Sequence, residues 1–209
     1  MRPIPASVGR IRCRSLLLLA ACAALAPLPA QGLAVGHTSR TFVDPARNNR
    51  QVPTEIFYPA EVAGDDVPLA DPGPAGFPVV AFGHGYLMAY DRYAYLWQAL
   101  VPEGFIVALP RTEGNLFPSH AEFGRDLAFL LLALQEEAGD PGSIFYGGVA
   151  AAGAVAGHSM GGGASLLAAR GDPAVAAVFN LAAAETNPSA IAAAGEVAAP
   201  ALLFSGSHD

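Results

Sequence analysis

The segment Gly157-His158-Ser159-Met160-Gly161 decides the fold that this chain is expected to adopt. It fits the pattern G-x-S-x-G, in which a serine stands on a sharp turn between a buried strand and a helix. The arms of that turn nearly touch, so the residues two before and two after the serine must be very small, and here both are glycine. The apolar run 150–156 suits the strand, although its alanine content does not prove one. The alternative is a glycine-rich turn that carries a serine by chance.

Composition indicates one globular domain that binds no nucleic acid. The 209 residues are 53% hydrophobic and 14% charged, which supports a large core, and the formal net charge of −7 includes no basic patch. No lysine follows the glycines after Ser159, so this stretch is not a phosphate-binding loop. No Cys/His cluster has zinc spacing, and the aspartates at 65, 66 and 71 are more simply a solvated loop than a calcium site. We therefore expect no metal and no cofactor.

Residues 1–30 are predicted to be a signal peptide. Four arginines within the first 14 residues precede an apolar stretch, and Pro27 to Ala30 offers a small-residue cleavage site. The alternative is a lipoprotein signal, because residues 19–22 resemble a lipobox that would lipidate Cys22. Both interpretations predict export, to the periplasm or the medium, with membrane attachment only through Cys22. The two cysteines, Cys13 and Cys22, both fall in this segment, so the mature part shown has no disulfide.

The rest of the chain alternates between strand and helix patterns. Apolar or β-branched runs predict strands at 54–58, 78–83, 105–109, 150–156, 175–181 and 201–205. Helical periodicity or capping predicts helices at 91–101, from Ser119 to Gly139, from the Ser159 turn to Arg170, and at 187–194. The proline-rich stretch 59–78 reads as an exposed loop. This alternation predicts an α/β fold with a mostly parallel sheet covered on both faces.

A serine on such a turn becomes a nucleophile only with a base, an acid that orients the base, and two N–H donors for the oxyanion. One donor is the residue after the serine, here Met160, and the other comes from the loop after an earlier strand. That loop begins Gly83-His84-Gly85-Tyr86, so the Tyr86 N–H is the expected second donor. His84 is more simply a side chain that shapes this loop than an acid or base. His158 is expected to be a pocket-wall or packing residue.

The acid and the base belong to the later part of the chain, in the order serine, acid, histidine. Asp209 follows the last apolar run and is the candidate acid, with Glu185 as the alternative. No residue follows Asp209, and His208 adjoins it too closely to be oriented by it. His37 and His120 precede the serine. We therefore expect that the sequence is truncated at its C-terminus, lacks the catalytic histidine, and is impaired as written.

These features together resemble the α/β-hydrolase superfamily. More narrowly, the chain is similar to the bacterial branch that includes polyester hydrolases and cutinases, platelet-activating-factor acetylhydrolase-like esterases and chlorophyllase-like proteins. The residues that carry the likeness are 157–163, 82–86 and 204–209, together with the strand entry at 54–59. The resemblance implies Ser159 as nucleophile, Asp209 as acid, and Tyr86 and Met160 as oxyanion donors. It also implies that the Tyr86 ring clamps an acyl or aromatic group.

The expected function is that of an exported serine esterase acting on small-molecule, lipid or polymer esters. Its domain is expected to span residues 31–209, to lack a last strand and helix, and to be monomeric when complete. One alternative is a catalytically inactive binding protein of the same fold, and another is an acyltransferase that uses the same serine. Sequence does not separate hydrolysis from acyl transfer, because both proceed through an acyl-enzyme.

Overall fold

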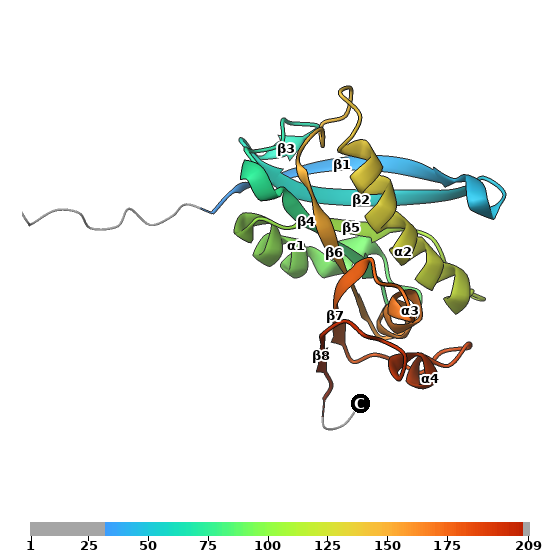
Figure 1. Cartoon of the computed structure of the whole chain (residues 1–209). Coiled ribbons are helices and arrows are strands. Elements are labelled where there is room, and N and C mark those ends of the chain that lie inside the picture. The colour runs from blue at the N-terminus through green and yellow to red at the C-terminus, as the bar shows by residue number, and fades with distance from the viewer. Residues whose placement is uncertain (1–31, 207–209) are drawn as a thin grey trace, which may run out of the picture. The chain divides into compact units, whose positions relative to one another are not determined.

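The computed structural model describes residues 32–206, and the chain forms one eight-stranded sheet in the order β3-β1-β2-β5-β4-β6-β7-β8 (Figure 1). The predicted signal peptide at 1–30 and the candidate acid Asp209 lie outside the described residues. The strands are β1 (Ala34–Asp44), β2 (Arg50–Ala60), β3 (Gly64–Asp65), β4 (Phe77–Gly83), β5 (Ile106–Pro110), β6 (Val149–His158), β7 (Val175–Leu181) and β8 (Ala201–Phe204).

The strands from β5 to β8 are parallel, while β2 pairs antiparallel with both β1 and β5. This arrangement confirms the predicted α/β fold with a mostly parallel sheet. Strand β4 lies between β5 and β6, so the chain moves to one side of β4 and then returns to the other. In open α/β sheets, ligands bind outside the carboxyl ends of the strands at such a reversal.

Helices cover both faces of this sheet. The four α-helices of residues 32–206 are α1 (Ala94–Leu100), α2 (His120–Glu137), α3 (Met160–Ala169) and α4 (Ala190–Ala194). Alternate residues of β4 separate two cores: Val79 and Ala81 pack in the cluster that contains α2 and α3, whereas Val80 and Phe82 pack in the cluster that contains α1. This two-faced burial is why β4 is a continuous apolar run in the sequence.

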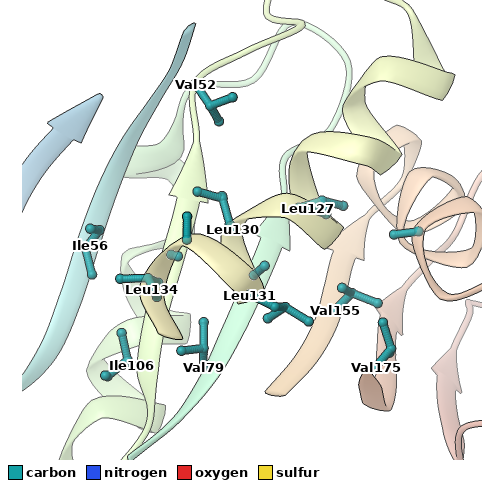
Figure 2. Close-up of a cluster of buried hydrophobic side chains, with 14 of the residues drawn as sticks. Val52, Ile56, Val79, Ile106, Leu127, Leu130, Leu131, Leu134, Val155 and Val175 are labelled. Atoms are coloured by element: carbon teal, nitrogen blue, oxygen red, sulfur yellow. The ribbon is translucent and has the colours of Figure 1, made fainter. Parts of the chain in front are cut away.

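The α2 helix is stabilised by an N-cap and by a stripe of leucines, both visible in its sequence. Its N-cap Ser119 accepts a hydrogen bond from the Glu122 N–H at 3.3 Å, as the capping-box spacing predicts. Figure 2 shows the leucines of α2 directed at valine and isoleucine side chains of the sheet. Four of these leucines have at most 2% of their surface exposed: Leu127, Leu130, Leu131 and Leu134.

The sequence prediction missed β1 and made β2 too short. The buried positions of β1 are Gly36, Thr38, Phe42 and Asp44, which are mostly small or polar, so apolar alternation is weak there. The turn between β1 and β2 carries Asn48 and Asn49, both with positive φ. Asparagine tolerates this region better than most residues, and two such residues in succession suit a tight hairpin.

Truncating Leu130 should destabilise the domain strongly, because the residue is fully buried between α2 and the sheet. We expect Leu130→Ala to lower the free energy of unfolding by about 2–5 kcal/mol. Leu132→Ala is the matched control, because Leu132 lies on the same helix with 50% of its surface exposed, and it should cost about 1 kcal/mol or less. Urea denaturation of both variants measures the difference, and equal losses would contradict this packing.

Candidate functional site

Ser159 stands on a strained turn between β6 and α3. Its backbone has φ 50° and ψ −116°, a conformation that a non-glycine residue rarely adopts. Three backbone hydrogen bonds hold it: the Ser159 N–H donates to the Leu181 carbonyl at 3.0 Å, and the Ser159 carbonyl accepts from the N–H groups of Gly163 at 3.1 Å and Ala184 at 2.9 Å. The end of β7 and the first turn of α3 therefore fix the serine, as the G-x-S-x-G pattern predicts.

The glycines around Ser159 are required by direct backbone contact. A Cβ atom at Gly157 would overlap the carbonyl group of Gly161, and a Cβ atom at Gly161 would overlap the carbonyl group of Gly83. A Cβ atom at Gly83 would in turn lie 2.9 Å from the Gly161 Cα. Gly83 and Gly157 are direct partners in the β4–β6 ladder, so β4, β6 and α3 meet at this point with no side chain between them.

The two expected oxyanion donors lie on the segments that meet at this contact. Met160 is the first residue of α3, and Tyr86 lies in a turn at residues 85–88 closed by a 3.0 Å hydrogen bond from the Met88 N–H to the Gly85 carbonyl. Leu87 takes φ 55° at the centre of this turn. Within residues 32–206, neither the Met160 N–H nor the Tyr86 N–H donates a hydrogen bond.

Tyr93 is the residue of this site that sequence reasoning missed. It was assigned only to the apolar face of a helix, since helical periodicity treats tyrosine as a core residue. The structure places its ring in the core and its hydroxyl against the turn at residues 85–88, where it accepts a 2.7 Å hydrogen bond from the Gly85 N–H. No signal in the sequence links Tyr93 to this turn, because the contact depends on tertiary packing.

The histidines of residues 32–206 all have partners. His84 is 3% exposed and lies 2.9 Å from the carbonyl oxygens of Gly85 and Thr112 through its two ring nitrogens, so it contacts the backbone of both loops. His158 lies 3.0 Å from the Tyr93 hydroxyl through Nδ1.

The other two described histidines also have partners. His37 lies between Glu55 and Asp65, and the Nδ1 atom of His120 accepts a hydrogen bond from the Asn187 N–H at 3.1 Å. None of these contacts involves the Ser159 hydroxyl.

Of the two acid candidates, Glu185 lies within the described residues, between β7 and α4, and Asp209 lies outside them. Strand β8 ends beside β7 at Phe204, at the same sheet edge as His158, so the segment that leads to Asp209 starts at this edge. Glu185 accepts a 3.0 Å hydrogen bond from the Ile191 N–H near the start of α4. Hydrogen bonds from the Ser189 hydroxyl and then the Ile191 N–H lower the pKa of Glu185. Glu185 therefore supports the start of α4.

A buried ion network fixes the loop after β5. Asp126 of α2 is fully buried and accepts hydrogen bonds from Arg50 at 2.7 and 2.8 Å and from the Thr112 hydroxyl at 2.6 Å. Hydrogen bonding to Asp126 raises the pKa of Arg50, so this side chain stays charged. Because the Thr112 carbonyl contacts His84, the network connects the β1–β2 hairpin to the loop that carries Tyr86. A buried carboxylate needs such partners.

A pocket of about 310 Å³ lies beside the loop that carries Tyr86. Its lining residues are His84, Leu87, Met88, Ala89, Tyr90, Arg111 and Gly114. Four exposed apolar side chains of the two neighbouring loops form a set that we call the apolar rim: Tyr86, Leu87, Leu116 and Phe117. Leu87 also lines the pocket, and Phe117 is 92% exposed. The Tyr86 hydroxyl donates to the Leu116 carbonyl at 2.9 Å and so joins the two loops that form the rim.

Two further properties concern residues 32–206 alone. No group of three or more His, Cys, Asp or Glu side chains in this part of the chain is arranged to hold a metal ion. The described helices are too short or too polar to span a lipid bilayer.

Comparison with known proteins shows the fold. No protein-family model matches the sequence, and no curated protein is similar to it. Among solved structures, the chain is similar to a ferulic acid esterase from Streptomyces cinnamoneus, with a TM-score of 0.59 and 20% identity over 85% of this chain and 66% of the esterase chain. The chain thus spans about two thirds of that structure's length. The likeness establishes the α/β architecture. The chemistry has to be argued from the residues around Ser159.

Replacing Gly161 should destabilise the domain, because any Cβ there meets the Gly83 backbone. We expect Gly161→Val to lower the free energy of unfolding by about 2 kcal/mol or more, measured by chemical denaturation. The control is Gly195→Ala: Gly195 has φ −68°, and the nearest atom to an added Cβ, outside its chain neighbours, is 3.5 Å away. That change should stay within about 0.5 kcal/mol. A Gly161→Val variant as stable as the control would refute the close contact.

Proposed function

We propose that the protein is a serine hydrolase that cleaves carboxylic esters through an acyl-enzyme at Ser159. The observation that carries this proposal is the strained Ser159 backbone at the junction of β6 and α3. Strain of this kind costs about 1–3 kcal/mol, persists only where the surrounding structure holds it, and clusters at active sites. The fold shared with a ferulic acid esterase supports an ester substrate, and the Met160 and Tyr86 N–H groups, which donate no hydrogen bond within residues 32–206, support acyl transfer.

In this mechanism the Ser159 Oγ attacks the ester carbonyl carbon while a base takes the hydroxyl proton. The carbonyl oxygen becomes an oxyanion that accepts hydrogen bonds from the Met160 and Tyr86 N–H groups. Collapse of the tetrahedral intermediate breaks the bond to the alcohol, which leaves with the proton from the base. Water then attacks the acyl-enzyme by the same route and releases the acid.

The proposed base is a histidine outside residues 32–206, with Asp209 as the acid that orients it. The reason is that His84 and His158 already contact carbonyl or hydroxyl oxygens and lack contact with the serine hydroxyl. Without a base, a serine remains a weak nucleophile at neutral pH. The oxyanion donors and substrate binding alone would then supply a rate about 10³-fold above water.

We infer that the substrate carries an apolar group next to its ester. The apolar rim presents aromatic and aliphatic side chains to solvent beside the proposed oxyanion donor Tyr86. Exposed apolar patches on soluble proteins mark sites that contact apolar partners. An ester in a lipid droplet or a polymer surface can cover the rim, whereas a small soluble ester reaches Ser159 without it.

The role of Ser159 is tested by replacing its hydroxyl. In a chain that carries the proposed histidine base, we expect Ser159→Ala to remove p-nitrophenyl acetate hydrolysis and fluorophosphonate labelling while the melting temperature changes little. With a base in place, the loss in kcat should reach about 10⁴-fold or more. Ser165→Ala is the control, because the buried Ser165 hydroxyl contacts Asn180 and the Gly162 carbonyl. Turnover by folded Ser159→Ala close to that of the unmodified protein would contradict the proposal.

The role of the apolar rim is tested with soluble and emulsified esters. We expect Phe117→Ser to lower the rate on a tributyrin emulsion several-fold while hydrolysis of dissolved p-nitrophenyl acetate stays nearly constant. The physical reason is the loss of apolar contact area from a side chain that is 92% exposed. Val62→Ser is the control, because Val62 is also exposed. It follows β2, which runs antiparallel to β5, and so lies at the end of the strands opposite to the loop that carries Phe117. Equal rates for both variants on the emulsion would contradict a role of the apolar rim in binding the ester surface.

A further inference from the structure

We propose that the Tyr93 hydroxyl is a positioning residue that holds the turn at residues 85–88 against β6, so that the Tyr86 N–H faces the oxyanion. This inference rests on the proposed function for the role of Tyr86. It adds a role for Tyr93 and gives His158 a task other than acid–base catalysis.

The contacts of the Tyr93 hydroxyl connect the turn to the nucleophile strand. Its oxygen accepts from the Gly85 N–H at 2.7 Å, lies 3.0 Å from His158 Nδ1, and donates toward the Met88 sulfur at 3.2 Å. A phenol oxygen offers one donor and two acceptor positions, which matches three neighbours. His158 is the last residue of β6 and precedes Ser159, while Gly85 precedes Tyr86. The hydroxyl therefore connects the residue that precedes Ser159 with the turn that carries the Tyr86 N–H.

Burial gives these contacts their strength. Tyr93 is 1% exposed, and desolvation raises the pKa of its hydroxyl, so the group stays protonated at neutral pH. A Cβ atom at Gly85 would lie 2.9 Å from both His158 Nδ1 and the Met88 sulfur, which shows how closely the turn packs on His158. Losing one partner would leave buried polar groups unsatisfied, and the turn would shift to regain water.

A purely structural tyrosine would behave differently. The Tyr93 ring packs against Phe82 with their centroids 4.9 Å apart, and a phenylalanine would preserve that contact. If packing were the whole role, removing the hydroxyl would change stability and leave catalysis at Ser159 unaffected. A positioning role predicts a loss in kcat with little change in KM, because the oxyanion forms only after the substrate binds.

The experiment compares Tyr93→Phe with Tyr58→Phe. Tyr58 is fully buried and donates to the Val67 carbonyl at 2.8 Å, so its variant loses an equivalent hydrogen bond away from the site. In Tyr93→Phe, we expect hydrogen exchange of the Gly85 amide to accelerate about ten-fold or more, since its acceptor is gone. We also expect kcat on p-nitrophenyl acetate to fall about 10- to 100-fold, with KM within about two-fold. Tyr58→Phe should change neither quantity.

Each outcome decides the inference. A Gly85 amide that exchanges at the same rate in Tyr93→Phe and the unmodified protein, or a kcat equal in both variants, would overturn it. If Tyr93→Phe fails to fold, the unmodified protein suffices: after correction for intrinsic rates, its Gly85 amide should exchange about ten-fold more slowly than that of Leu87, and equal rates would overturn the inference. If a chain that carries the proposed histidine base neither hydrolyses esters nor reacts with a fluorophosphonate, the proposed function fails, while Gly85 exchange still decides whether Tyr93 holds the turn.

Discussion

The direct contact of three backbone segments at Gly83, Gly157 and Gly161 is the constraint on which the site depends. These residues belong to β4, β6 and α3, and an added Cβ at any of them would collide with another of the three segments. The contact sets how near α3 lies to the sheet and forces the chain to reverse at Ser159. The strained φ of Ser159 follows from this geometry, because a wider turn would separate α3 from β4.

The parts of the fold that sequence predicted are those in which local rules agree with the tertiary structure. The turn at Ser159 was predicted because glycines at fixed spacing state its geometry directly. The α2 helix was predicted because the Ser119 cap and the leucine stripe point to the same element. Strand β7, at Val175–Leu181, was predicted with its observed bounds. In each case the side chains themselves carry the periodicity or the backbone requirement.

The parts that sequence did not predict depend on partners far away along the chain. Strand β1 escaped because its buried side chains are small or polar, so it lacks an apolar pattern. The role of Tyr93 depends on a hydroxyl that meets Gly85 and His158, which periodicity does not encode. The burial of Asp126 depends on arginines more than 70 positions earlier in the chain. Buried polar contacts of this kind are specified by three-dimensional packing alone.

Because of the Arg50–Asp126–Thr112 connection, the β1–β2 hairpin cannot be exchanged independently of the rest of the domain. Arg50 begins β2, Asp126 lies on α2, and Thr112 follows β5, so one cluster ties the β1–β2 hairpin to the loop after β5 and, through His84, to the loop that carries Tyr86. A hairpin exchanged with that of another protein would leave the Asp126 carboxylate buried without its guanidinium partners. The hairpin, helix and loop therefore form a unit for recombination, although they are separate in sequence.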